Sequence, residues 1–177
     1  MPGDRTADAA ARILLVAGPD LGSDWIATPI APEESTLEQG DLCGKAAAGE
    51  ANRIVEVATD LTSESFEGAG RHQLSRYQPG SAATAAQAMI SALSGCTKAA
   101  QDFDGQPAVV SVTPTGPSTF TYSLTFGPDA VNYGALAISV AGDYVSTSAS
   151  FAADATTAAT LAGKLDAAAK KKLAAAR

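Results

Sequence analysis

The chain has 177 residues, with 46% hydrophobic but only 6% aromatic side chains, which fits one globular domain over 1–177 with a core of small residues. Nineteen acidic residues against twelve basic ones give a net charge of −7, and this balance disfavours nucleic acid or an anionic membrane as a partner, because both require clustered lysine and arginine. No run of about eighteen apolar residues occurs, so the sequence predicts no membrane-spanning helix.

The N-terminal part predicts one short helix. Residues 1–7 read as a disordered lead, and Asp8 can cap a helix that continues to about Val16. Gly18, which a proline follows, would end this helix.

Trp25 is the only tryptophan of the chain. We weigh two roles for it: an apolar anchor beneath the N-terminal helix, or an exposed platform on which a ligand stacks. Residues 26–39 carry prolines and acidic side chains, and we expect them to form a surface excursion. Partial alternation then predicts a strand over 52–62, and a second strand is expected over 71–77.

A helix follows this pair of strands. Apolar side chains at helical spacing predict it over 81–94, with Ser81 as its cap and Gly95 at its end. Residues 97–105 are polar and read as a connection.

The clearest pattern lies in 119–126, where large apolar side chains alternate strictly with threonine and serine. This alternation predicts a strand with one buried and one wet face. Short turns place that strand in an antiparallel meander over 108–113, 119–126, 131–141 and 144–151. A stripe of leucine and alanine predicts a last helix over 153–175.

Together these elements predict an α+β fold. We expect an antiparallel sheet of about five to six strands, ending in the meander and covered on one face by two or three helices, as a two-layer sandwich.

Cys43 and Cys96 are the only cysteines, and with a single histidine they do not form a zinc pattern. A structural disulfide between them would close a loop of about fifty residues and contribute roughly 4 kcal/mol; two buried free thiols are the alternative. No signal peptide is recognisable. A disulfide would imply an oxidising compartment, and hence a mature chain whose leader was removed; without it, the protein could be cytoplasmic.

Polar side chains on the second predicted strand are the main candidates for a site. His72, the only histidine, shares a face with Leu74 and Arg76, while Tyr77 points the other way. His72 and Arg76 with nearby hydroxyls could bind an anionic ligand; the alternative is a histidine held in a local hydrogen-bond network.

Catalytic and metal-binding motifs are missing from the sequence. No phosphate-binding loop, dinucleotide fingerprint, nucleophile elbow or zinc-protease motif occurs. Residues 102–105 lack the third carboxylate and the distant glutamate of a calcium loop, so they predict a turn. We therefore assign no catalytic residue, no metal site and no cofactor.

Several segments carry a family resemblance. They are Cys43-Gly44, the stretch HQLSRYQPGSA at 72–82, the helix that ends at Cys96, the small-residue hairpin and the alanine-rich C-terminal helix. This layout resembles the extracellular sensor domain of PknH-type receptor kinases and the actinobacterial secreted lipoproteins related to it. The segment DLGSDW at 20–25 is similar to the D-L-G-x-x-W opening of such lipoproteins.

The resemblance implies a two-layer α/β sandwich with a cleft, an extracytoplasmic location, a possible lipid anchor on a removed leader, and ligand sensing rather than catalysis. We therefore expect a single sensor-like domain that binds an unknown small molecule or envelope component. The residues expected to line its cleft are Trp25, His72, Arg76, Tyr77, Tyr122 and Tyr133.

Two other classes of protein remain as alternatives. One is a small cyclase or hydrolase of specialised metabolism that uses the same cleft, with tyrosine and histidine as acid–base groups. The other is a scaffold that binds a partner protein through an exposed apolar patch.

Overall fold

The computed structural model describes residues 5–30, 50–65, 68–103, 105–128 and 130–175. Within them the helices are α1 (Arg5–Arg12), α2 (Gly18–Leu21), α3 (Ala82–Ser94) and α4 (Ala155–Ala175), with a 3-10 turn, η3, at Glu50–Asn52. None of these helices is both long enough and apolar enough to cross a membrane.

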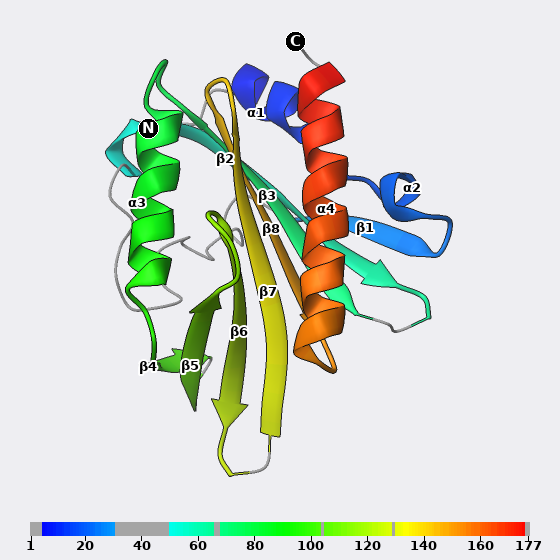
Figure 1. Cartoon of the computed structure of the whole chain (residues 1–177). Coiled ribbons are helices and arrows are strands. Elements are labelled where there is room, and N and C mark those ends of the chain that lie inside the picture. The colour runs from blue at the N-terminus through cyan, green and yellow to red at the C-terminus, as the bar shows by residue number, and fades with distance from the viewer. Residues whose placement is uncertain (1–4, 31–49, 66–67, 104, 129, 176–177) are drawn as a thin grey trace.

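Eight strands of the described residues form one sheet, in the order β1-β2-β3-β8-β7-β6-β5-β4. Every neighbouring pair is antiparallel. The strands are β1 (Trp25–Ile30), β2 (Arg53–Ser63), β3 (Ala69–Tyr77), β4 (Ala99–Phe103), β5 (Gln106–Pro114), β6 (Thr119–Phe126), β7 (Ala130–Ala141) and β8 (Tyr144–Ala152). The expected meander is confirmed as β5 to β8, and the sheet extends beyond it on both sides (Figure 1).

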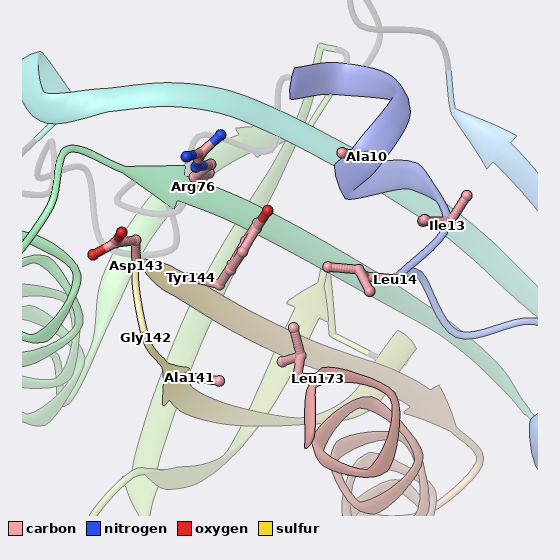
Figure 2. Close-up of a pocket in the computed structure, with 9 residues that line it drawn as sticks. All are labelled: Ala10, Ile13, Leu14, Arg76, Ala141, Gly142, Asp143, Tyr144 and Leu173. Carbon is pink, nitrogen blue, oxygen red and sulfur yellow. The ribbon is translucent and has the colours of Figure 1, made fainter. Parts of the chain in front are cut away.

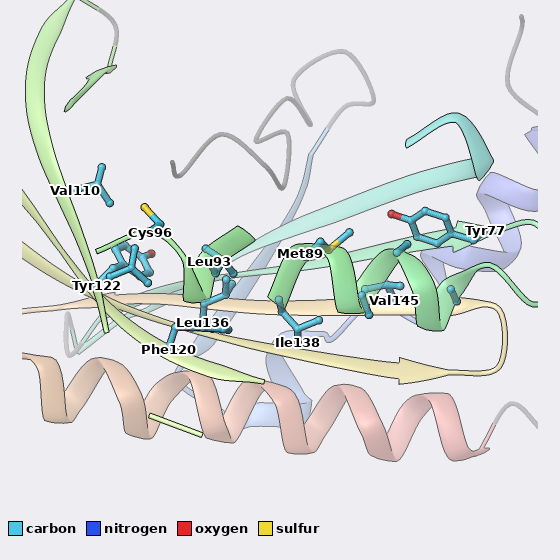
Figure 3. Packing of buried hydrophobic residues seen from close by; sticks show 14 of the residues in the cluster. Tyr77, Met89, Leu93, Cys96, Val110, Phe120, Tyr122, Leu136, Ile138 and Val145 are labelled. Carbon is cyan, nitrogen blue, oxygen red and sulfur yellow. The ribbon is translucent and has the colours of Figure 1, made fainter. Parts of the chain in front are cut away.

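The alternation in β6 produces the largest part of the core. Phe120, Tyr122 and Leu124 are buried on one face, where α3 covers them with Met89 and Leu93 (Figure 3). Each such side chain contributes about 1.5–3 kcal/mol when it is fully buried. The cluster includes Tyr77, Ala82, Ala85, Ala86, Met89, Leu93, Cys96, Val110, Val112, Phe120, Tyr122, Leu124, Leu136, Ile138 and Val145.

The other face of the sheet is lined by small residues and is covered by α4. Gly70 lies directly beneath Leu165 of the helix, and any larger residue there would displace that leucine. Ala135 of β7 packs against Ala158 and Ala162 in the same way. Small side chains on the strands therefore let α4 lie close to the sheet.

The sequence-based expectation that the helices cover one face in two layers is wrong. Helices α3 and α4 lie on opposite sides of the sheet (Figure 3). The reason is visible in β7, where Leu136 and Ile138 face α3 while Ala135 faces α4. A strand that is apolar on both faces needs cover on both.

Two strands were missed because they form the edges of the sheet. β1 lies within the segment expected to be a surface excursion, and its Pro29 is tolerated because an edge strand has a row of groups without ladder partners. β4 lies within the segment expected to be a polar connection. Neither strand has the alternating pattern on which the other predictions relied.

The N-terminal helix is shifted relative to its prediction. α1 begins at Arg5, not at a cap on Asp8, and ends at Arg12. The chain then tightens into a turn in which the Leu15 N–H donates to the Arg12 carbonyl. The next N–H, that of Val16, donates to His72 instead of continuing the helix.

Gly134 provides a direct test of the packing beneath α3. A Cβ at this position would overlap the ring of Tyr122 on the neighbouring strand. We expect Gly134→Ala to lower the free energy of unfolding by about 1–3 kcal/mol, because the buried ring must shift. Urea denaturation measures this change.

Gly163→Ala is the matched control for that experiment. Gly163 is exposed on α4, and a Cβ there would meet no atom within 4 Å. It should raise the free energy of unfolding by about 0.5–1 kcal/mol through helix propensity. Equal effects of the two substitutions would show that Tyr122 does not pack against Gly134.

Candidate functional site

A pocket of about 380 Å³ lies at one end of the sheet, between α1 and the C-terminal part of α4 (Figure 2). Its walls come from four places that are distant in the sequence. The lining residues are Ala10, Ile13 and Leu14 from α1 and the turn after it, Arg76 from β3, Ala141, Gly142, Asp143 and Tyr144 from the β7–β8 hairpin, and Leu173 from α4.

Strand pairing sets the polar side of the pocket. Arg76 of β3 is directly opposite Tyr144 of β8 in the register, so both side chains leave the same face of the sheet. Figure 2 shows the two side chains on the same side of their strands.

The hairpin that carries Tyr144 is held at its tip. Gly142 has φ 62°, the left-handed conformation that a tight hairpin turn requires. Asp143 accepts a hydrogen bond from the Gly80 N–H through Oδ1 at 3.2 Å, and its carbonyl accepts one from the Tyr77 N–H at 2.9 Å. These bonds connect the hairpin to the end of β3, so the polar wall is fixed by backbone geometry.

The apolar side of the pocket is the open edge of a small core cluster. Ala11, Leu15, Val55, Val57, Leu74 and Leu173 are its buried members, and Leu14, Ala141 and Tyr144 pack against it while remaining partly exposed. Ile13 is 76% exposed beside them. Apolar side chains are therefore left in contact with solvent where α1 and α4 do not meet.

Arg76 and Tyr144 have polar groups that no described residue satisfies. The guanidinium of Arg76 forms no ion pair or hydrogen bond in the described part of the chain. The nearest arginine on the same strand, Arg71, is by contrast paired with Asp60 through Nε at 2.7 Å and Nη2 at 3.0 Å. The hydroxyl of Tyr144 likewise has no partner among the described residues.

The ammonium group of Lys172 connects α4 to the segment after α1 beside the pocket. Lys172 donates to the Leu15 carbonyl at 2.7 Å and pairs with Asp20 at 3.0 Å. Asp20 also accepts the Ala17 N–H at 2.7 Å. Burial opposes the charged form of Asp20, but the Ala17 hydrogen bond and Lys172 together lower its pKa. The C-terminal end of α4 is thereby tied to the segment that follows α1.

His72 belongs to this support and not to the pocket wall. It is fully buried, its Nδ1 accepts the Val16 N–H at 3.0 Å, and its Nε2 lies 3.0 Å from Ser146 Oγ. Because Nδ1 accepts, the proton is on Nε2 and is donated to the serine. Burial, with the nearby positive charge of Lys172, lowers the pKa of His72 to about 4.

The structure separates the residues that were expected to line one cleft. Arg76 alone lines the pocket. Trp25 is buried under α4, with Lys164 at 5.8 Å from its ring centre. Tyr77 and Tyr122 lie in the core cluster on the opposite face, under α3. Tyr133 is half-buried near the start of β7, at the other end of that strand from the pocket.

The Tyr122 hydroxyl is buried in the core and hydrogen-bonded there. It donates to the Ser150 carbonyl at 3.5 Å, and its ring packs edge-on against Phe151 with the centroids 5.6 Å apart. Burial raises the pKa of Tyr122 above its ordinary value. Trp25 is not an exposed platform, because its exposed fraction is 7%. It is an apolar anchor, but it packs with α4 and the segment after α1, and not with the N-terminal helix itself.

Cys96 is buried beyond the end of α3, and Cys43 lies outside the described residues, so the disulfide between them stays a prediction. The segment expected to be a turn, 102–105, is partly described: Asp102 and Phe103 belong to β4. Among the described residues, no three histidine, cysteine or acidic side chains lie close enough together to hold a metal ion.

Sequence reasoning found Arg76 but missed the rest of the lining. Leu14 and Leu173 look like ordinary helix residues in sequence, and Tyr144 opens a strand. Only the position of α1 over β2, next to the end of α4, brings them together. Nothing in the sequence indicated that the guanidinium of Arg76 would lack an internal partner, beyond the polar character of its strand.

The architecture defines a class: an α+β domain with one antiparallel sheet, helices on both faces and a pocket at one end of the sheet. No family model and no curated protein matches the chain. Among solved structures it is similar to the extracellular domain of PknH from Mycobacterium tuberculosis, with a TM-score of 0.65 and 13% identity over 93% of this chain and 96% of that one. The two chains share the same overall fold.

A second solved structure is more distant. CalU16 from Micromonospora echinospora matches with a TM-score of 0.30 and 13% identity, over 68% of this chain and 94% of that one.

The low pKa of His72 makes stability depend on pH. The unfolded chain binds a proton on His72 below its ordinary pKa of 6.5, whereas the folded protein does not until about pH 4. The free energy of unfolding therefore falls as the pH drops through this window, by about 3 kcal/mol from this residue. Urea denaturation at pH 7.5 and at pH 4 measures the loss.

His72→Asn is the control, because its side-chain oxygen can still accept the Val16 N–H but does not titrate. The variant should lose about 3 kcal/mol less than the parent between the two pH values. Equal losses of unfolding free energy in the variant and the parent would mean that folding does not lower the pKa of His72.

Proposed function

We propose that this protein is an extracytoplasmic binding domain for a small molecule or envelope component, without catalytic activity. The pocket at the end of the sheet is the observation that carries the proposal. Its volume of about 380 Å³ falls at the low end of the range of roughly 300–1,000 Å³ typical of small-molecule sites. The apolar side of the pocket, formed by Leu14, Ala141 and Leu173, is its apolar floor. Such a floor with a few polar groups on one side is also typical of small-molecule sites.

The likeness to the PknH extracellular domain supports the role in sensing. We propose that the chain is related to such sensor domains and to the secreted lipoproteins that resemble them. An envelope location also agrees with the proposed disulfide between Cys43 and Cys96, since disulfides persist in oxidising compartments. No described residue is a free cysteine.

The chemistry of the pocket favours binding over catalysis. Its ionisable side chains are Arg76, Asp143 and Tyr144, and Asp143 already accepts a backbone hydrogen bond. An acid–base mechanism needs a proton acceptor positioned next to the reacting group. His72, the residue that the enzyme alternative would use, is enclosed beneath α4 with both ring nitrogens bonded.

Ala10→Trp tests this proposal. Ala10 is exposed and lines the pocket from α1, so an indole there fills the space without disturbing the core. Three ten-carbon probes, decan-1-ol, decanoate and decylamine, are titrated by calorimetry. At least one should bind the parent protein with one-to-one stoichiometry, and Ala10→Trp should weaken that binding at least about tenfold, since it removes several buried methylene contacts.

Ala9→Trp is the matched control. Ala9 is exposed on the same helix and does not line the pocket, so this variant should bind like the parent. Absence of binding by all three probes, or equal binding by Ala10→Trp and the parent, would contradict the pocket as a ligand site.

A further inference from the structure

We propose that the pocket selects a small anionic amphiphile: a single carboxylate or phosphate head group on Arg76 and Tyr144, and a short hydrocarbon chain on the apolar floor. This inference rests on the proposed function and specifies the class of ligand.

The free guanidinium of Arg76 is the first argument. It is half-buried, held by a central strand, and unpaired with any residue that the structure describes. In a chain of net charge −7, the other arginine of this strand has a carboxylate partner. A planar, permanently charged donor with no internal partner matches the geometry of a carboxylate or phosphate.

Tyr144 adds a neutral donor at the same place. Its register opposite Arg76 places the two side chains next to one another on the same face of the sheet (Figure 2). Each of them can donate to an anion that binds on this face. The permanent positive charge of Arg76 beside this neutral donor favours an anion over an amine or a neutral alcohol.

Asp143 is the one carboxylate of the lining, and its placement is compatible with an anion. Its carboxylate points away from Leu14 and Tyr144 in Figure 2. Oδ1 accepts the Gly80 N–H, and no ion pair connects it with Arg76 among the described residues. Its negative charge therefore lies on the far side of the hairpin turn from the apolar floor.

The floor sets the nature and size of the rest of the ligand. Leu14, Leu173 and Ala141 present only hydrocarbon to the pocket, so an alkyl chain there gains about 0.8 kcal/mol for each methylene that is buried. The volume of about 380 Å³ accommodates one short chain and not the two long chains of a membrane phospholipid. The selected ligand is therefore a single-chain acid or phosphate ester.

The three ten-carbon probes separate this inference from the proposed function. Decanoate should bind about tenfold more tightly than decan-1-ol, because the head group gains a charge-assisted hydrogen bond, and decylamine should bind most weakly. Arg76→Gln should reduce decanoate affinity about tenfold while leaving decan-1-ol affinity within twofold. Arg76→Lys, which retains the charge, should keep part of the preference for decanoate.

Arg71→Gln is the matched control. Arg71 is on the same strand but faces the opposite side of the sheet, paired with Asp60, so its removal should leave the preference for decanoate unchanged. Circular dichroism verifies that each variant is folded.

Two results would overturn the inference while the proposed function stands: binding of decan-1-ol or decylamine as tightly as decanoate, or an unchanged decanoate affinity in folded Arg76→Gln. Absence of binding by all three probes contradicts the proposed function itself, and this inference with it.

Discussion

The pocket depends on one polar junction between the two ends of the chain. Lys172 near the end of α4 donates to the Leu15 carbonyl, while His72 accepts the N–H of the same peptide bond, that of Val16. These bonds satisfy a carbonyl and an N–H that follow the end of α1 and have no helical partner. They also fix α1 and α4 on the same face of the sheet, with a gap between them that Tyr144 and Leu14 line.

The two faces of the sheet pack differently against their helices because their side chains differ in size. The face under α3 carries large residues such as Phe120 and Leu136, which pack against Met89 of the helix. The face under α4 is lined by small residues such as Gly70 and Ala135, so the helix lies close along most of its length. At the C-terminal end of α4, beside the shorter α1, this cover is incomplete.

Local patterns predicted the elements whose own side chains determine their conformation. The alternation over 119–126 and the leucine stripe of the last helix have a physical period that is visible in one sequence. The edge strands β1 and β4 have no such period, because pairing with β2 and β5 determines their conformation. Helix placement on both faces also depends on packing across the whole sheet.

The candidate site shows the same limit. Arg76 was identified from its polar strand, but His72 on the same strand face is enclosed by α4, an element more than eighty residues further along the chain. Polarity indicates which residues can bind a ligand, and tertiary packing decides which of them meet solvent. Tyr77 and Tyr122 were misplaced for this reason, since their rings are buried under α3.

Mapping of backbone amide shifts by nuclear magnetic resonance, with saturating decanoate, tests the central claim most directly. The account predicts that the largest shifts occur at Leu14, Tyr144 and Leu173, the residues that enclose the pocket from α1, β8 and α4. Shifts that centre instead on Met89 and Phe120, beneath α3, would contradict it.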